Sequence, residues 1–249
     1  MREISLDDVW VRRFHEGPDR APFLVCFPHA GGSANYFSPL SGMLRSSAQV
    51  LALQYPGRQD RRHHRCLTTI DAFADEVFAA LEPIMKQPVA FFGHSMGAMI
   101  AFEVATRMRE RLDTEPGVLM VSGRRAPSRH REEPGVHLRD DDGIVAELKG
   151  LSGTDTRVLD DPDVLDMILP AVRGDYTAVE TYRYRPRPVL GCPIVALTGD
   201  EDPKADLDEV EGWRDHTTGA FRMHTFRGGH FYLVEHGKAV ADVIARHLP

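Results

Sequence analysis

The stretch Val89-Ala90-Phe91-Phe92-Gly93-His94-Ser95-Met96-Gly97-Ala98 decides how this chain of 249 residues folds. Its first four residues are apolar and typical of a short buried strand. Apolar residues recur at helical spacing from Gly97 to about Arg111, which predicts a helix there. The G-x-S-x-G between the two elements is typical of a sharp strand-to-helix turn that exposes a serine hydroxyl. Ser95 is therefore the candidate nucleophile.

The same alternation of strand and helix runs through most of the chain. Short apolar runs that predict strands occupy residues 22–27, 50–53, 89–92, 118–121, 194–197 and 221–226. Helical patterns occupy residues 70–85, 97–111, 205–216 and 235–247. Strands that alternate with helices indicate βαβ units, and hence an α/β fold with a mostly parallel central sheet flanked by helices.

The alternation breaks between Ala126 and Pro188, where no buried strand is expected. Two helical patterns lie there, at 140–151 and 161–182, with Asp161 placed to cap the second. Pro170 is expected to end or kink that helix near Leu169. These patterns predict a core made of residues 1–125 and 189–249, with 126–188 as a helical lid insertion. Two ordinary crossover helices are the alternative.

Composition excludes several other classes of protein. The 30 Lys and Arg against 37 Asp and Glu give a net charge of −7, which disfavours a nucleic-acid partner. No apolar run approaches the roughly 18 residues of a membrane span, and the opening MREISLDDVWVRRF lacks the apolar stretch of a signal peptide. Three cysteines without a CxxC pair favour a cytoplasmic location. Twelve histidines form neither HExxH nor a zinc-spaced cluster, so no metal or other cofactor is expected. A monomer is expected.

A nucleophilic serine needs a base and an acid that orients the base. In this architecture the chain order is serine, acid, histidine. His230 follows two glycines, which permit a tight loop that can turn its imidazole toward Ser95, whereas His94 should point away from the hydroxyl. The acid lies in Thr198-Gly199-Asp200-Glu201-Asp202-Pro203. Asp202 is the preferred acid, because the loop has left the strand end there, and Asp200 is the alternative.

Two backbone N–H groups are needed to stabilise the oxyanion that forms when the serine attacks a carbonyl. The first is expected from Met96, directly after the nucleophile. The second is expected from Ala30, in the glycine-rich loop Phe27-Pro28-His29-Ala30-Gly31-Gly32-Ser33 after an early strand. A glycine-rich turn without a catalytic role is the alternative for this loop.

Five motifs resemble one known family in their order and spacing. They are FPHAGGSANYF, LQYPGRQDR, FFGHSMGAMIAFEVA, LTGDEDP and GGHFYL, and they extend from about residue 27 to residue 233. In these motifs the chain resembles the discrete type II thioesterases of polyketide and nonribosomal peptide synthesis, which are α/β-hydrolases. The resemblance implies a triad of Ser95, Asp202 and His230, oxyanion amides at Ala30 and Met96, and a helical lid.

The resemblance also implies a reaction and a partner. Such enzymes hydrolyse stalled acyl groups from the phosphopantetheine arm of acyl or peptidyl carrier proteins, and some release starter units or finished chains. No carrier-like G-x-D-S segment precedes the hydrolase motifs, so a free-standing enzyme is expected. The alternatives are a general serine esterase or lipase of the same fold, an acyltransferase, and a non-catalytic acyl-binding protein.

Two further sets of residues are candidates for substrate recognition. Carrier docking could use the arginines after YPG or those where the lid begins; a solvated charged face is the alternative for both. The two arginine sets are Arg58, Arg61, Arg62 and Arg65, and Arg124, Arg125, Arg129 and Arg131. Acyl-chain contacts are considered for Leu148, Leu151, Ile168 and Leu169. Packing of these four side chains on the sheet is the alternative.

Overall fold

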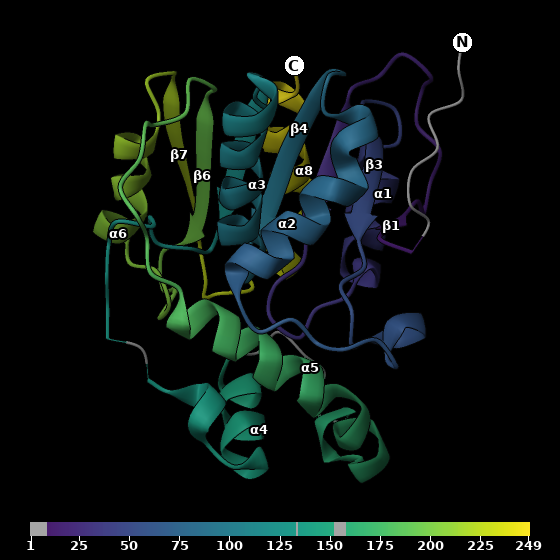
Figure 1. The fold of residues 1–249 in the computed structure, drawn as a ribbon, viewed down its shortest axis with the longest axis vertical. Coiled ribbons are helices and arrows are strands. Elements are labelled where there is room, and N and C mark those ends of the chain that lie inside the picture. Colours follow the sequence, from purple (N-terminus) through teal and green to yellow (C-terminus); the bar gives the residue numbers. More distant parts are fainter. Residues whose placement is uncertain (1–8, 133, 152–157) are drawn as a thin grey trace.

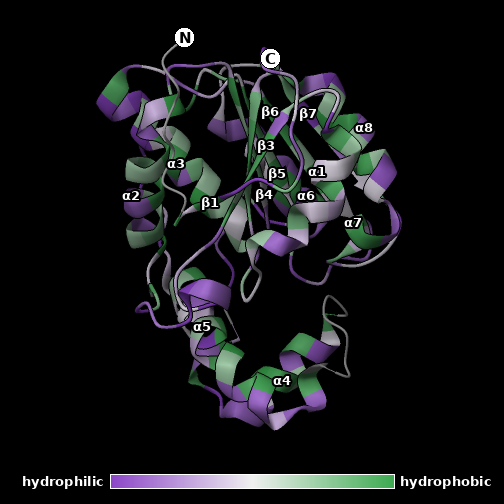
Figure 2. Ribbon diagram, turned by 90° about the vertical axis from the view of Figure 1, so that its right-hand side faces the viewer, coloured by the Kyte–Doolittle hydropathy of each residue, from purple (hydrophilic) through white to green (hydrophobic). Residues whose placement is uncertain are grey.

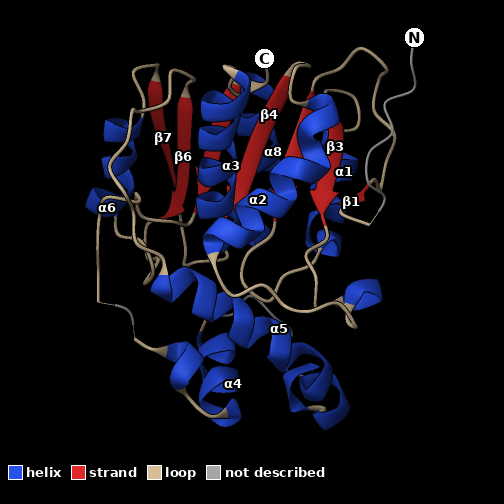
Figure 3. Cartoon of the chain, in the orientation of Figure 1, coloured by secondary structure: helices blue, strands red, loops and turns tan. Residues whose placement is uncertain are grey.

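A seven-stranded sheet forms the centre of the molecule in a computed structural model of the chain (Figures 1 and 3). The structure describes residues 9–132, 134–151 and 158–249. The first eight residues, which form part of the stretch used to judge a signal peptide, lie outside the described residues. So do positions 133 and 152–157 of the expected lid.

The strands follow the order β1-β3-β2-β4-β5-β6-β7. Their bounds are Val11–Arg12 (β1), Phe23–Phe27 (β2), Gln49–Leu53 (β3), Val89–His94 (β4), Val118–Ser122 (β5), Ile194–Gly199 (β6) and Phe221–Phe226 (β7). All neighbouring strands are parallel except β1, which pairs antiparallel with β3. The six predicted strands and the mostly parallel sheet are confirmed, and β1 is an edge strand that the sequence analysis did not predict.

Helices cover both faces of the sheet (Figure 1). The helices α2 (Ile70–Leu81) and α3 (Met96–Leu112) pack side by side on one face, and α1 (Ser38–Leu44) and α8 (Gly237–His247) pack together on the other. The short helices α6 (Leu207–Glu211) and α7 (Tyr232–Glu235) lie near the ends of β6 and β7. Helices were expected at α2, α3, α6 and α8, whereas α1 was not.

The two faces of the sheet bury two separate hydrophobic cores. Along β2, Val25 and Phe27 point into the core beneath α2 and α3, and Leu24 and Cys26 point into the core beneath α1 and α8. All four side chains are fully buried. Strands buried on both faces read as continuous apolar runs, which explains why these segments could be recognised in the sequence.

The chain between β5 and β6 leaves the sheet and forms a separate helical layer, which we call the insertion (residues 126–188). Its helices α4 (Asp141–Gly150) and α5 (Pro162–Thr181) lie below the end of the sheet at which β4 runs into α3 (Figures 1 and 2). The described part of the insertion contains no strand. A small core of its own holds the insertion together, formed by Val136, Ile144, Leu169, Val172 and Tyr176.

Helix α5 begins as the sequence predicts. The Asp161 side chain accepts hydrogen bonds from the N–H groups of Asp163 and Val164, and Pro162 is the first helical residue. Pro170 is expected to end or kink this helix: it does not end it, because α5 continues to Thr181 with the proline inside it, and the kink stays a prediction. Pro170 is exposed, so water can reach the carbonyl that lacks its helical donor.

Candidate active site

Ser95 occupies a strained turn between β4 and α3. Its backbone angles, φ 55° and ψ −118°, are unusual for a residue with a side chain. Its N–H donates to the carbonyl of Ser122 at 2.7 Å, which holds the turn against β5. A Cβ on Gly93 would lie 2.3 Å from the carbonyl oxygen of Gly97, and one on Gly97 would lie 2.0 Å from that of Phe27. Both glycines of the motif are therefore required by the close approach of backbones.

Three side chains from three separate loops form a continuous hydrogen-bonded chain. The Nε2 atom of His230 lies 2.9 Å from Oγ of Ser95. Its Nδ1 atom lies 2.9 Å and 3.0 Å from the two carboxylate oxygens of Asp202. His230 and Asp202 are buried. With the proton on Nδ1, the imidazole donates to the carboxylate and leaves Nε2 free to accept the serine proton.

The two aspartates that the sequence left in competition occupy different positions. Asp202 faces the imidazole, and its Oδ1 also accepts the N–H of Lys204 at 2.8 Å. Asp200 is exposed, and its Oδ1 accepts the N–H of Gly228 at 2.8 Å. Asp200 therefore holds the loop that carries His230, and the geometry supports Asp202 as the acid that orients the base.

The two residues nominated as oxyanion donors lie beside the serine. Met96 is the first residue of α3, so its N–H points out of the helix end without a preceding helical carbonyl to accept it. Ala30 lines the same cavity as Ser95. The turn around it is closed by a hydrogen bond of 2.9 Å from the N–H of Gly32 to the carbonyl of His29. The oxyanion role of both amides stays a prediction.

His94 is adjacent to the serine in sequence but turned away from it. Its Nδ1 lies 2.9 Å from the hydroxyl of Ser122, which in turn lies 2.7 Å from the hydroxyl of Tyr232. Burial, with a contribution from the charge of His230, holds the pKa of His94 well below its ordinary value. His94 is therefore a neutral residue that packs against the ring of His230. This position agrees with the expectation that His94 is not the catalytic base.

His29 is a residue of the site that sequence reasoning did not single out. Its ring is buried, lines the cavity with Ser95 and packs edge-on against Phe231. Burial, with smaller contributions from the charges of His230 and Arg58, lowers the pKa of His29 to about 3. The glycine at position 32 is the only trace of this packing in the motif. In the structure, a Cβ at Gly32 would lie 2.8 Å from the imidazole of His29, so the ring leaves no room for a side chain there.

An apolar cavity of about 170 Å³ opens beside the serine. It is formed jointly by the core and the insertion, and is lined by His29, Ala30, Gly31, Ser95, Leu148, Leu151, Leu159, Ile168, Val172, Tyr176, His230 and Phe231. Three of the four apolar residues considered for acyl contact, Leu148, Leu151 and Ile168, line it. Leu169 packs instead in the small core of the insertion.

The arginines considered for carrier docking differ in exposure: Arg62, Arg65 and Arg129 are exposed, whereas Arg124 and Arg125 are buried. Arg58 and Arg61 are buried, and Arg61 stacks over the ring of Trp10. Arg131 is paired with Glu209 at 2.6 Å. The first arginine set is therefore wrong for Arg58, whose guanidinium is bound to Asp175, and for Arg61, which donates to the carbonyl of Gln54. Arg62 and Arg65 are exposed, and their role in docking stays a prediction.

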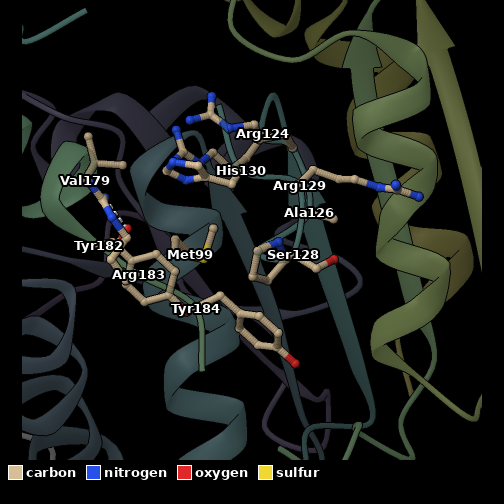
Figure 4. Close-up of a pocket in the computed structure, with 12 residues that line it drawn as sticks. Met99, Arg124, Ala126, Ser128, Arg129, His130, Val179, Tyr182, Arg183 and Tyr184 are labelled. Atoms are coloured by element: carbon tan, nitrogen blue, oxygen red, sulfur yellow. Dashed lines mark hydrogen bonds between the residues drawn. The ribbon is translucent and has the colours of Figure 1, made fainter. Parts of the chain in front are cut away.

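Arg124 and Arg125 line a second cavity, of about 180 Å³, beside Met99 of α3. Figure 4 shows Arg124 and His130 on one side of it and Tyr182 and other residues after α5 on the opposite side. Its lining includes four arginines, at positions 124, 125, 129 and 183. This cavity is therefore a strongly cationic recess beside α3, the helix that begins directly after Ser95.

Neither a metal site nor a membrane-spanning helix is present in the described residues, 9–132, 134–151 and 158–249. They hold no group of three or more His, Cys, Asp or Glu side chains placed to bind a metal ion. They also hold no helix with the length and apolar character needed to span a bilayer.

The sheet order, the elbow at Ser95 and the linked serine, histidine and aspartate define a serine hydrolase of the α/β-hydrolase fold. The model of the thioesterase domain family matches residues 22–248. The chain belongs to this thioesterase family.

Within this family, the chain is similar to thioesterases of biosynthetic gene clusters. A probable cadicidin biosynthesis thioesterase from Streptomyces griseus is 50% identical over 239 residues, which cover 96% of this chain and 66% of that protein. Thioesterase PikA5 from Streptomyces venezuelae is 49% identical over 249 residues, covering 99% of this chain and 88% of that protein. The solved structure of the type II thioesterase BorB from the borrelidin biosynthetic cluster superimposes with a TM-score of 0.92 at 50% identity. The match covers 98% of this chain and all of that one.

Proposed function

We propose that this protein is a discrete type II thioesterase that hydrolyses acyl thioesters on the phosphopantetheine arm of acyl or peptidyl carrier proteins, and so clears stalled polyketide or nonribosomal peptide synthases. The observation that carries the proposal is the chain of hydrogen bonds from Ser95 through His230 to Asp202 beside an apolar cavity. The close relatives named as thioesterases of biosynthetic clusters support the choice of substrate.

The proposed reaction follows from the positions of these groups. His230 removes the proton of Ser95 through Nε2 while the hydroxyl oxygen attacks the thioester carbonyl. The amides of Ala30 and Met96 stabilise the oxyanion, and Asp202 stabilises the imidazolium. The imidazolium then protonates the departing thiolate. In the second half of the reaction His230 activates a water molecule, which releases the acid from the serine.

The insertion acts as a lid over the acyl chain. Its residues Leu148, Ile168 and Val172 provide one wall of the cavity, and Ser95 and His29 belong to the core on the other side. We therefore assign residues 1–125 and 189–249 to the hydrolase core and 126–188 to the lid. An acyl chain bound between the two would exclude water from the apolar wall and place its carbonyl at the serine.

The cationic recess lined by Arg124 and Arg125 is the proposed point of attraction for the anionic carrier. Carrier proteins of these pathways are acidic and their prosthetic arm carries a phosphate, whereas this chain has a net charge of −7. A local concentration of arginines can attract such a partner despite the unfavourable net charge. We further propose that the enzyme is a monomer, and that it works in the cytoplasm, a location with which three unpaired cysteines agree.

The direct test uses carrier proteins loaded with several different acyl groups. Deacylation is followed by the intact mass of each carrier, with Ser95→Ala as the control. We expect release of the acyl group by the wild-type enzyme and none above background by the variant. If no loaded carrier loses its acyl group, the proposed function is wrong.

A second experiment separates the thioesterase from a general esterase. Hydrolysis of an acyl-pantetheine thioester is compared with hydrolysis of its oxoester analogue. We expect faster turnover of the thioester, and turnover of the oxoester alone would identify an esterase instead.

The carrier-docking proposal is tested by the double variant Arg124→Glu, Arg125→Glu. We expect slower deacylation of a loaded carrier and little change with a small acyl-pantetheine thioester. Unchanged turnover of the carrier substrate would exclude the recess as the docking point. Thermal unfolding checks that the two buried substitutions leave the protein folded.

A further inference from the structure

A buried ion pair lies directly behind the glycine-rich loop of the site. Arg58, in the loop after β3, binds Asp175, on α5, with two parallel hydrogen bonds of 2.8 Å. Asp175 is completely inaccessible to solvent and Arg58 nearly so. The pair therefore joins a loop of the core to a helix of the insertion in a fixed, bidentate geometry.

Both members of this pair also bind the loop that carries Ala30. The Oδ2 atom of Asp175 accepts the N–H of Gly31 at 2.7 Å. The Nη1 atom of Arg58 donates to the carbonyl of Gly32 at 3.0 Å. The peptide before Gly31 and the peptide after Gly32 are thus each held by a charged side chain, and the N–H of Ala30 lies one residue before the first of these contacts.

The residues of α5 around Asp175 touch the acyl cavity. Val172 and Tyr176 line it. Val172 also packs closely against Gly31: a Cβ added to Gly31 would lie 3.0 Å from a methyl group of Val172. Gly31 also has a φ of 75°, in the region that favours glycine. The position of α5 and the conformation of the loop at Ala30 are therefore mechanically connected.

Stability alone is a weak explanation for this arrangement. A buried ion pair has to repay the loss of hydration of both charges, and apolar residues of similar volume often stabilise a protein as well or better. What an apolar pair cannot supply is a directional acceptor for the N–H of Gly31. An unpaired N–H at that position would leave the loop free to rotate away from the serine.

We propose that Asp175, held by Arg58, is a positioning residue that fixes the loop at Ala30 for oxyanion binding and makes the oxyanion site depend on the placement of α5. The inference rests on the proposed function, because it assumes that acyl groups are hydrolysed at Ser95. Occupation of the acyl cavity, which presses on Val172 and Tyr176, is then sensed at the oxyanion loop through the carboxylate of Asp175.

The test compares two double variants that both remove the ion pair. In Arg58→Met, Asp175→Asn, the amide oxygen at position 175 can still accept the N–H of Gly31. In Arg58→Met, Asp175→Leu, it cannot. The substrate is the N-acetylcysteamine thioester of a short fatty acid, and the measurements are kcat, KM, the pH profile of kcat and inhibition by an alkyl boronic acid. The boronic acid forms a tetrahedral adduct on the serine and so reports on the oxyanion site.

We expect the asparagine variant to lose part of its kcat, because Arg58 no longer binds the carbonyl of Gly32, but to keep far more activity than the leucine variant, because the N–H of Gly31 keeps its acceptor. In the leucine variant kcat should fall roughly 10²–10³-fold, as on loss of one oxyanion donor. Its KM should change little, and its affinity for the boronic acid should fall by a factor similar to that of kcat. The midpoint of its pH profile should not move, because His230 and Asp202 are untouched. A general structural defect would instead be expected to change KM and the pH profile together with kcat and the affinity for the boronic acid.

Equal kcat values for the two folded double variants would overturn the proposal. If the leucine variant does not fold, Asp175→Glu provides the same test with the charges balanced. It displaces the carboxylate by one methylene, and kcat should then fall roughly 10- to 100-fold. Wild-type kcat in Asp175→Glu would also overturn the proposal. A wild-type enzyme without thioester hydrolysis would instead refute the proposed function, so the two failures are distinguishable.

Discussion

At the scale of single residues, the backbone of Ser95 shows how strain places a nucleophile. A side-chain-bearing residue held in such a rarely populated conformation costs on the order of 1–3 kcal/mol. The hydrogen bond from its N–H to Ser122 and the packed strands β4 and β5 hold it there. This conformation places Oγ of Ser95 at 2.9 Å from Nε2 of His230. The serine can therefore lose its proton to the imidazole without first changing its conformation.

The two neighbouring aspartates allow a matched test of the acid. Asp202→Asn should lower kcat by about 10³–10⁴, because an amide cannot stabilise the imidazolium and favours the wrong tautomer. Asp200→Asn should keep most activity, because its amide oxygen can still accept the N–H of Gly228. The measurement is steady-state hydrolysis of an acyl-pantetheine thioester by both variants. A larger loss in Asp200→Asn than in Asp202→Asn would reverse the assignment.

His216 provides a prediction for the dependence of stability on pH. Burial among aromatic rings lowers its pKa to about 4, and its Nε2 lies 2.8 Å from the hydroxyl of Ser128. The folded state therefore keeps His216 neutral, while the unfolded chain binds a proton below about pH 6.5. The free energy of unfolding must then fall as the pH is lowered from about 6.5 to about 4.

His216→Gln removes this titration and can still hydrogen bond to Ser128. Urea unfolding at several pH values should show about one proton fewer taken up on unfolding between pH 4 and 6.5. Some acid sensitivity should remain, since burial also lowers the pKa values of His29 and His94. Identical pH slopes for variant and wild type would contradict the prediction.

At the scale of elements, the close crossing of β2, β4 and α3 decides which glycines are indispensable. Gly97→Ala would place a methyl group 2.0 Å from the carbonyl oxygen of Phe27, so a backbone has to move. We expect a loss of unfolding free energy of about 1–3 kcal/mol or more, together with loss of thioester hydrolysis. The urea midpoint measures the first and a thioester assay the second.

Gly150→Ala is the control for this substitution. Gly150 is the exposed last residue of α4, and no atom of the described residues lies within 4 Å of the place where its Cβ would be. Alanine should leave hydrolysis unchanged and stabilise the helix by up to about 0.5–1 kcal/mol. A comparable loss of stability in both variants would show that the crossing at Gly97 is less tight than the structure indicates.

The elements that could be predicted from the sequence carry strong local signals. Strands such as β4 are buried on both faces and read as apolar runs, and α5 begins with Asp161 and Pro162. The strand β1 has two residues and an irregular apolar pattern, so nothing local distinguishes it from a loop. Pro170 lies inside α5 because the packing of Leu169 and Val172 outweighs the missing hydrogen bond, and packing cannot be read from a single segment.

The residues of the candidate site also fall into two groups: some carry a local signal in the sequence, and others are decided only by the folded structure. Ser95 and His230 could be nominated because each lies in a glycine-marked turn next to a strand or helix. The choice between Asp200 and Asp202 depends on which side chain faces His230, which only the folded loop decides. The burial of Arg58 could not be foreseen, because its partner Asp175 is 117 positions away in the chain.

At the scale of the whole molecule, the cavity for the acyl chain belongs to neither the core nor the insertion alone. The core contributes Ser95, His230 and the loop at Ala30, and the insertion contributes the apolar wall. On the proposed function, we therefore expect the core to determine the chemistry and the side chains of α4 and α5 to determine which acyl groups fit. Changes in the insertion should then alter chain-length preference without altering the reaction of a very short acyl group.

Two adjacent residues of α5 test this division. Ile168 lines the cavity, whereas Met167 is exposed on the outer side of the helix. Ile168→Trp should fill part of the space of about 170 Å³ and lower kcat/KM for an octanoyl thioester by about tenfold or more. The acetyl thioester should react at nearly the wild-type rate, because its short chain does not reach that wall. Met167→Trp adds the same bulk outside the cavity and should leave the octanoyl-to-acetyl ratio unchanged. Equal ratios for the two variants would mean that the acyl chain lies elsewhere and that the insertion does not select it.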